Sequence, residues 1–186
     1  MREFGSSSLS LAGSLLIAHP SLLDPNFCKT VLFLSTNDAE EGSFGVVLNR
    51  PSGRTVADVL PDEELGPLGK IPVLIGGPVA SDQLIFASFR WQPVGKKMEC
   101  KHHLVLEEAR AALNEDRTVV RAFIGYAGWS KGQLEAELAQ HAWLVQKPDR
   151  EILRISRTAT IWRETLSTFG PWYQLVAEAP DDPSRN

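Results

Sequence analysis

The sequence GYAGWSKGQLEAEL, residues 125–138, joins an apolar run to a helical pattern through a Gly-rich turn. Gly125 and Gly128 allow backbone conformations that other residues rarely adopt, which suits a point where a strand must turn into a helix. Trp129 is large enough to cover such a junction as an apolar lid. We therefore interpret this stretch as a joint between a strand and a helix.

The start of the predicted helix carries a capping-box pattern. Ser130 precedes the periodic residues and Gln133 follows three positions later, so the two residues can satisfy free backbone N–H groups at the helix start. Leu134 and Leu138 are four residues apart and share one face, whereas Glu135 and Glu137 are expected to face solvent. These features predict that the helix begins at Ser130.

The same joint permits a functional interpretation. Where a strand passes through a Gly turn into a helix, free backbone N–H groups lie next to the positive end of the helix dipole. Such a place is favourable for a carboxylate or a phosphate. A nucleophile elbow is excluded, because its G-x-S-x-G pattern needs a serine where this chain has Ala127. The structural and the anion-binding interpretations both stay open.

Short apolar runs rich in Val, Ile, Leu and Phe predict strands at 11–18, 29–35, 45–49, 71–77, 83–89, 118–127 and 142–147. Helical patterns cover 55–60, 105–116, 130–140 and 158–169. The stretch 90–97 and the surroundings of Trp172 resemble loops. A polar turn at 37–43 predicts a hairpin with an acidic tip. Strands cluster early and helices late. This order predicts an α+β fold, a single compact domain with a mixed, largely antiparallel β-sheet and a few helices packed on it.

Composition limits the class of protein. The chain has 186 residues, 43% of them hydrophobic, which is enough for one domain with a substantial core. Its formal net charge of −4 disfavours non-specific binding to nucleic acid or to anionic lipid. Two cysteines are too few for a disulfide framework. No apolar run approaches the roughly 18 residues of a membrane span, so we expect a cytoplasmic protein without membrane association.

Both chain ends are polar. Residues 1–8 are rich in Gly and Ser and predict a disordered N-terminal segment. Residues 179–186 form a C-terminal tail in which Pro180 and Pro183 prevent a helix from continuing. The predicted domain therefore spans residues 9–178.

Two further turns at strand ends are candidates for ligand binding. Asn49 and Arg50 follow a strand, and their amide and guanidinium groups can bind an anion. Alternatively, Asn49 closes a turn and Arg50 binds nearby carbonyls. Gly76 and Gly77 can let a ligand approach the backbone, although Gly-Gly-Pro is also an ordinary tight turn.

A hydrolase is an alternative function. Ser21 lies two residues from His19, and Asp24 or a carboxylate such as Glu135 can complete a catalytic group. Adjacency in sequence is weak support for this interpretation, because catalytic partners are recognised by their geometry in the fold.

Neither a metal nor a cofactor is expected. His102 and His103 point to opposite faces in a regular strand, and Cys100 with His102 supplies only two ligands on one face. The sequence contains no G-x-G-x-x-G, Walker A or CxxC pattern and no helix-turn-helix. Acidic residues accompany the arginines of the C-terminal region, which predicts an exposed face of mixed charge: Arg150, Arg154, Arg157 and Arg163.

Four blocks resemble the AlgH/YqgE family in their order and spacing: 13–27 (GSLLIAHPSLLDPNF), 45–51 (GVVLNRP), 75–79 (IGGPV) and 125–138, followed by AWL at 142–144. The resemblance implies a compact cytosolic bacterial α+β domain with no established enzymatic activity and no cofactor. The family is linked to transcriptional regulation of exopolysaccharide synthesis, but this chain shows no DNA-reading element. Ala87 and Ser88 stand where members often carry Leu-His.

The leading hypothesis is a non-enzymatic regulatory protein that binds a small anionic ligand or a protein partner. The alternatives are a hydrolase that uses Ser21 and His19 or a carboxylate, and a DNA-binding transcriptional regulator, which the net charge disfavours. No catalytic or metal-binding residue is assigned. The candidate ligand-binding residues are Asn49, Arg50, Gly76, Gly77, Gly128, Trp129 and Ser130.

Overall fold

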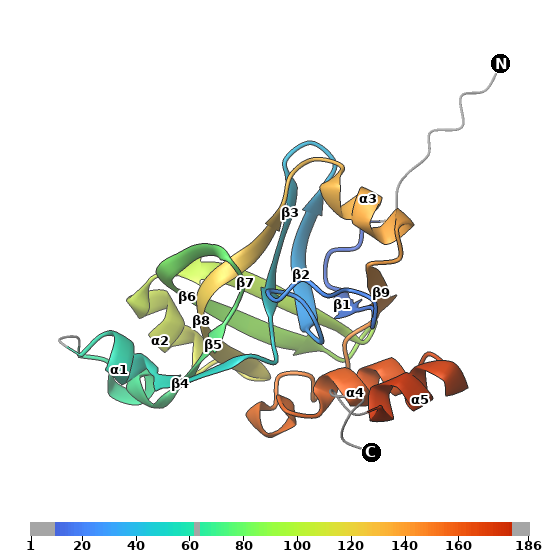
Figure 1. Cartoon of the computed structure of the whole chain (residues 1–186). Coiled ribbons are helices and arrows are strands. Elements are labelled where there is room, and N and C mark those ends of the chain that lie inside the picture. The colour runs from blue at the N-terminus through green and yellow to red at the C-terminus, as the bar shows by residue number, and fades with distance from the viewer. Residues whose placement is uncertain (1–9, 62–63, 180–186) are drawn as a thin grey trace.

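Strand β8 (Thr118–Trp129) connects two halves of the sheet in the computed structural model, which describes residues 10–61 and 64–179 (Figure 1). The first part of β8 pairs in parallel with β5 (Pro72–Ile75) and antiparallel with β6 (Val79–Gln92). Its last three residues pair antiparallel with β3 (Gly42–Val47). One strand therefore belongs to both halves, and its course determines how they meet.

The described residues form nine strands and five α-helices. The remaining strands are β1 (Leu15–Ala18), β2 (Val31–Asp38), β4 (Pro51–Thr55), β7 (Lys97–Leu104) and β9 (Trp143–Gln146). The helices are α1 (Val56–Val59), α2 (Leu106–Ala112), α3 (Gln133–Ala139), α4 (Ile161–Ser167) and α5 (Pro171–Glu178), with 3-10 turns at Gly66–Lys70 and Ile155–Arg157. The strand order is β4-β5-β8-β3-β2-β1-β9, and β6 branches from β8 to pair with β7.

The predicted fold class is confirmed. Among the described strands, every pairing is antiparallel except that of β5 with β8, so the sheet is mixed and largely antiparallel. The helices lie against this sheet in one compact domain (Figure 1). The predicted N-terminal segment 1–8 and most of the predicted tail 179–186 lie outside the described residues.

The short strand β1 is buried on both faces, and its residues alternate between two apolar clusters. Leu15 and Ile17 belong to the cluster that includes Trp162 of α4. Leu16 and Ala18 belong to the cluster that includes Leu134 of α3. Strands covered on both faces have continuous apolar sequences, which explains why β1 is recognisable in the sequence.

Two side chains tie the C-terminal segment to the sheet. The indole Nε1 of Trp162 donates a hydrogen bond to the carbonyl of Ala18, at 2.9 Å, at the end of β1. The guanidinium of Arg121 on β8 donates from Nε and Nη2 to the carbonyl of Leu153, at 3.2 and 2.5 Å. Buried carbonyls need such donors, so these bonds fix where α4 and the turn before it lie on the sheet.

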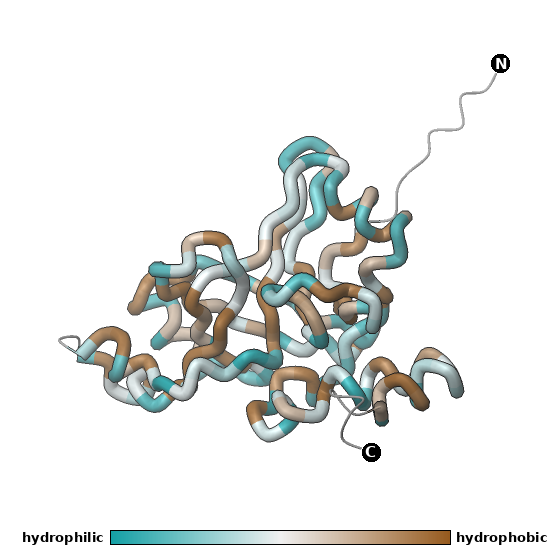
Figure 2. The backbone as a smooth tube through the Cα atoms, in the orientation of Figure 1, coloured by the Kyte–Doolittle hydropathy of each residue, from teal (hydrophilic) through white to brown (hydrophobic). Residues whose placement is uncertain are grey.

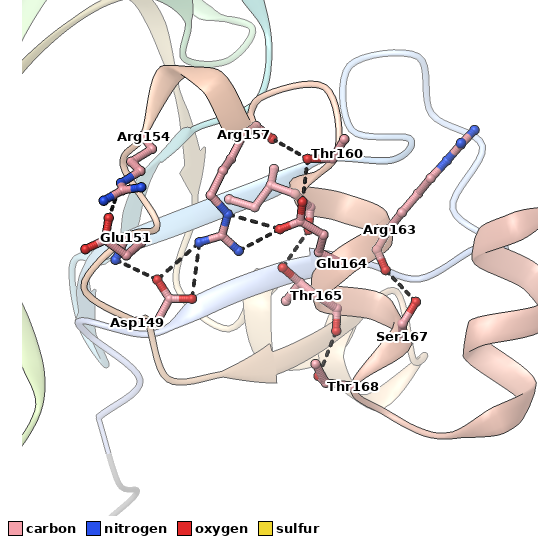
Figure 3. Close-up of polar contacts among 11 residues, drawn as sticks. Asp149, Glu151, Arg154, Arg157, Thr160, Arg163, Glu164, Thr165, Ser167 and Thr168 are labelled. Atoms are coloured by element: carbon pink, nitrogen blue, oxygen red, sulfur yellow. Dashed lines mark hydrogen bonds and ion pairs between the residues drawn. The ribbon is translucent and has the colours of Figure 1, made fainter.

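Arg157 organises the turn that precedes α4 (Figure 3). Its Nε and Nη2 donate to Oε2 of Glu164, at 3.0 and 2.8 Å, and its Nη1 lies 3.3 Å from both carboxylate oxygens of Asp149. The hydroxyl of Thr160 donates to the other oxygen of Glu164 at 2.5 Å. Acidic residues do accompany this arginine, as expected, but its side chain is only 24% exposed and does not belong to an exposed face.

Two stretches predicted as loops contain regular structure. In the predicted loop 90–97, β6 continues to Gln92 and β7 begins at Lys97, so only residues 93–96 form the turn between the two strands. Trp172 was expected in a loop but lies in α5, which starts at Pro171 with the preference of proline for the first helical turn. In both stretches, pairing or packing with distant residues stabilises segments whose local patterns are weak.

Helix α3 begins later than the capping-box pattern predicts. The helix starts at Gln133, and Gly132 occupies the N-cap position with φ of +75°. The backbone N–H and the hydroxyl of Ser130 still contact Oε1 of Gln133, at 3.1 and 3.2 Å. The predicted pair of side chains therefore meets in the turn before the helix, and a left-handed glycine starts the helix itself.

The Glu164 ion pair predicts a pH-dependent contribution to stability. Hydrogen bonds from Thr160 and Arg157 hold the pKa of Glu164 below its ordinary value of 4.5. A carboxyl with a lowered folded-state pKa stabilises the fold above its unfolded-state pKa, and this contribution is lost as the pH falls through the folded-state pKa. We expect Glu164→Gln to lower Tm by about 1–3 °C at neutral pH.

Thermal melts at a series of pH values test this expectation, with Glu115→Gln, a substitution of an exposed carboxyl after α2, as the control. The Tm difference between Glu164→Gln and the unsubstituted protein should disappear in acid. A difference that persists in acid contradicts the ion-pair account.

Candidate functional site

An open groove of about 750 Å³ lies beside the β2–β3 hairpin and the end of β8. We name it the hairpin groove; its apolar lining includes Phe44, Val79 and Tyr126, and its acidic lining includes Asp38 and Glu41. The tip of the hairpin, at the top of the molecule in Figure 2, is hydrophilic. The groove therefore places aromatic surface next to negative charge.

The aromatic lining is a packed group. The ring centroids of Phe44 and Tyr126 are 4.9 Å apart, and Phe44 also stacks on His102 with centroids 4.2 Å apart. Val79 lies opposite Tyr126 in the pairing of β6 with β8 and is 38% exposed. Rings held by one another in this way present a preformed apolar surface to a binding partner.

The acidic lining is held by backbone hydrogen bonds. Oδ1 of Asp38 accepts the N–H groups of Glu40 and Glu41, at 2.7 and 2.9 Å. These bonds lower the pKa of Asp38, so its carboxylate is ionised at neutral pH. Lys131 pairs with Glu40 at 2.5 Å. The acidic tip that the sequence predicts at 37–43 is confirmed.

Trp129 lines the groove but is only 5% exposed. Its indole Nε1 donates to Oε2 of Glu137 at 2.8 Å, and the indole of Trp143 donates to the same oxygen at 2.8 Å. Gln133 donates to the other oxygen of Glu137 at 3.1 Å. Glu135 is exposed as expected, but the expectation that Glu137 also faces solvent is wrong: it is half-buried, because two buried indole N–H groups require an acceptor and this carboxylate provides it.

Gly76 and Gly77 cross the backbone of β8 at close range. A Cβ on Gly76 would lie 2.3 Å from the carbonyl oxygen of Gly125, and a Cβ on Gly77 would lie 2.2 Å from the carbonyl carbon of Tyr126. The N–H of Gly76 donates to the carbonyl of Ile124 at 2.8 Å. Gly125 itself has φ of +69°. The close approach therefore packs the backbone of Gly76 and Gly77 directly against the backbone of β8 around Gly125.

Asn49 and Arg50 bind the backbone of the segment before β2. Oδ1 of Asn49 accepts the N–H of Val31, and its Nδ2 donates to the carbonyl of Lys29, both at 2.9 Å. Nη1 and Nη2 of Arg50 donate to two carbonyls of the 25–28 loop, at 2.8 and 3.1 Å. These contacts match the turn-closing alternative that the sequence analysis left open.

The structure distributes the predicted ligand-binding residues over three places. Gly128 and Trp129 line the hairpin groove, and the exposed Ser130 follows them. The glycine pair lies at the β8 crossing, Asn49 binds the backbone of Lys29 and Val31, and Arg50 binds the 25–28 loop. Ligand binding at these residues stays a prediction, whereas the aromatic lining of the groove by Phe44 and Tyr126 was not predicted.

The serine and histidine of the hydrolase alternative do meet. Oγ of Ser21 lies 2.7 Å from Nδ1 of His19, and the backbone N–H of Ser21 donates to the same nitrogen at 3.2 Å. Asp24 accepts the N–H of Asn26 at 2.7 Å. Nδ1 of His19 thus accepts hydrogen bonds from the hydroxyl and the backbone N–H of Ser21 within one tight turn. Asp24 closes the next turn in the same way. Both sets of contacts stabilise the local backbone.

A bulge in β7 produces a histidine pair that the sequence pattern does not predict. Phe86 pairs with Leu104 and Ala87 with His102, so His103 is an extra residue, and its φ is +58°. The Nδ1 atoms of His102 and His103 lie 2.7 Å apart. The expectation of opposite faces is wrong, because the bulge breaks the two-residue alternation of a regular strand.

Burial shifts the pKa values of two side chains of β7, His102 and Cys100. Burial and the neighbouring His103 lower the pKa of His102, and burial raises the pKa of the Cys100 thiol to about 11. Within residues 10–61 and 64–179, no three or more His, Cys, Asp or Glu side chains gather as a metal-binding group. Nor does any helix of these ranges have the length and apolarity to cross a membrane.

Comparison with known sequences places the chain in a family, because the sequence model of the AlgH-like family matches residues 15–174. The chain belongs to the AlgH-like family. This AlgH-like chain is 39% identical to a UPF0301 protein of Streptomyces avermitilis, over 95% of this chain and 96% of that protein. It is 36% identical to a UPF0301 protein of Pseudomonas fluorescens, over 77% of this chain and 80% of that protein.

Two solved structures share the AlgH-like fold. The solution structure of AlgH from Pseudomonas aeruginosa matches with a TM-score of 0.64 and 29% identity, over 98% of this chain and all of that one (100%). A crystal structure of a Corynebacterium diphtheriae protein matches with a TM-score of 0.64 and 20% identity, over 90% of this chain and 92% of that one. The resemblance to the AlgH/YqgE family that the sequence shows is therefore confirmed.

The β8 crossing predicts an asymmetric response to alanine substitution. Gly76→Ala forces a Cβ against the Gly125 carbonyl, so we expect it to lower the free energy of unfolding by about 1–3 kcal/mol or to prevent folding. Gly69→Ala is the matched control, since its Cβ would meet neighbours at 3.4 Å or more. Urea denaturation measures both. Equal stability of the two variants would contradict the crossing as a packing constraint.

The Ser21 turn predicts a negative result with a serine-reactive probe. Because His19 and Asp24 serve local turns, we expect a fluorophosphonate probe to leave Ser21 unmodified, as measured by intact-protein mass spectrometry. A known serine hydrolase in the same reaction serves as the positive control. Labelling that both Ser21→Ala and His19→Ala abolish would instead support the hydrolase alternative.

Proposed function

We propose that this AlgH-like protein is a non-enzymatic cytoplasmic regulatory protein that binds a protein partner in the hairpin groove. The observation that carries the proposal is the packed aromatic pair Phe44 and Tyr126 in an open groove beside the ionised Asp38. Aromatic residues at the centre of a binding surface and charges at its edge are the usual arrangement of a protein interface.

The chemistry of the groove favours one kind of partner segment. Phe44, Tyr126 and the partly exposed Val79 offer apolar contact, and Asp38 and Glu41 supply negative charge. A volume of about 750 Å³ accommodates several side chains of a peptide. The complementary segment carries an aromatic or aliphatic side chain next to Lys or Arg.

A small anion has less support than a protein partner. The guanidinium of Arg50 already donates to two backbone carbonyls, and Gly76 and Gly77 pack against β8. The acidic lining of the groove repels a phosphate or a carboxylate, and it repels the DNA backbone for the same reason. Charge complementarity therefore favours a basic partner segment over an anionic ligand or DNA.

Selection from a random peptide library on the immobilised protein tests the proposal. We expect enriched peptides to combine a basic residue with an aromatic or aliphatic residue, and to bind more weakly as the salt concentration rises. Tyr126→Ala should weaken binding of these peptides at least about tenfold, as expected for a central aromatic contact. Glu41→Lys should weaken it mainly at low salt.

Trp172→Ala is the matched control, because Trp172 is a 56% exposed aromatic residue on α5 and does not line the groove. Circular dichroism and thermal melts establish that each variant is folded. Peptides that bind Tyr126→Ala as tightly as the unsubstituted protein, or that lose binding only in Trp172→Ala, would show that the groove is not the partner site.

A further inference from the structure

The bulge at His103 places two imidazoles where a regular strand would separate them. In the pairing of β7 with β6, His102 lies opposite Ala87 and Leu104 lies opposite Phe86, so His103 is an extra residue without a partner in the register. It adopts the left-handed conformation with φ of +58°. A residue other than glycine adopts this conformation at some energetic cost, so its presence in an ordered strand calls for a physical reason. The consequence of the bulge is that both rings lie on one side of β7.

The two rings are fixed by aromatic neighbours as well as by the backbone. His102 stacks on Phe44 with centroids 4.2 Å apart and an interplanar angle of 25°, and His103 lies 5.3 Å from the same ring. Tyr126 lies 6.1 Å from His103. His102 is half-buried and His103 is exposed. The pair is thus preorganised and still accessible to solvent.

We propose that His102 and His103 form a two-histidine site for a divalent transition-metal ion such as Ni²⁺, Cu²⁺ or Zn²⁺, with Nδ1 of each ring as ligand. Imidazole nitrogens are preferred ligands of these ions. The proposal does not depend on a partner in the hairpin groove.

The geometry of the pair is close to that of two ligands on one ion. Nitrogen ligands at about 2.0–2.1 Å from Zn²⁺ lie about 3 Å apart when they subtend a right angle. The observed separation of the two Nδ1 atoms is 2.7 Å. To bind one ion, the two side chains must rotate so that the Nδ1 lone pairs point to a common position and the separation of the nitrogens increases by a few tenths of an ångström.

Binding exchanges a shared proton for the metal. In the hydrogen bond between the rings, one Nδ1 carries a proton and the other accepts it. When both nitrogens coordinate the ion, the Nδ1 proton of the donor ring is replaced by a proton on Nε2 of the same ring, so each imidazole stays neutral and no net proton is released. No electron transfer is involved. Since the described residues hold no larger group of His, Cys, Asp and Glu ligands, water completes the coordination of the ion.

Isothermal titration calorimetry tests the proposal. The tag-free full chain is titrated with Ni²⁺ or Zn²⁺ alone. We expect one ion per chain. His103→Asn keeps a residue that tolerates the left-handed conformation, and His102→Phe keeps a ring on Phe44, so both variants preserve the bulge while removing one ligand. Each variant should weaken metal binding at least about tenfold, because one protein ligand remains.

His141→Asn is the matched control, since His141 is also a left-handed histidine, with φ of +57°, and lies outside β7. It should bind the metal as the unsubstituted protein does. Absence of binding to the unsubstituted protein, equal binding by all three variants, or a loss confined to His141→Asn would each overturn the site. Continuous-wave EPR with Cu²⁺ adds a second readout, in which the coordinating nitrogens should decrease in His102→Phe and in His103→Asn.

Discussion

The close crossing of two backbones at Gly76, Gly77 and Gly125 is the constraint on which the rest of the structure depends. No Cβ fits between these segments, so glycine is required for the crossing. Because the crossing is possible, β8 pairs with β5 and with most of β6 before Gly125, and with Val79 of β6 and with β3 after it. The β2–β3 hairpin then lies beside the end of β8, and the hairpin groove forms between them.

Several polar side chains bind the protein's own backbone and indole groups, and two of them, Asn49 and Arg50, resemble ligand-binding groups in the sequence. Asn49 substitutes for a strand partner of Val31, and Arg50 binds carbonyls of the 25–28 loop. Glu137 accepts the indole N–H groups of two tryptophans. Burial of donors and acceptors without partners is unfavourable, so such side chains are needed wherever loops and strands meet inside the protein.

The chemically distinctive surfaces arise where regular strand geometry is interrupted. The bulge at His103 brings two imidazoles together against Phe44, and Phe44 and Tyr126 in turn line the hairpin groove. The aromatic group therefore connects the proposed metal site with the proposed partner site. Membership in the AlgH-like family establishes the ancestry of the fold, while the function is argued from these surfaces.

The sequence by itself determined the α+β class, most strands, the joint between β8 and α3 and the resemblance to the family, because hydrophobic periodicity and turn residues act over short distances along the chain. The tertiary structure alone decided the extent of β7, the position of α5, the inward turn of Glu137 and the pairing of His102 with His103. Each of these features depends on which distant segment becomes a neighbour. Strand register, bulges and the partners of buried polar groups are properties of such contacts, so the hairpin groove and the histidine pair became visible only in the folded chain.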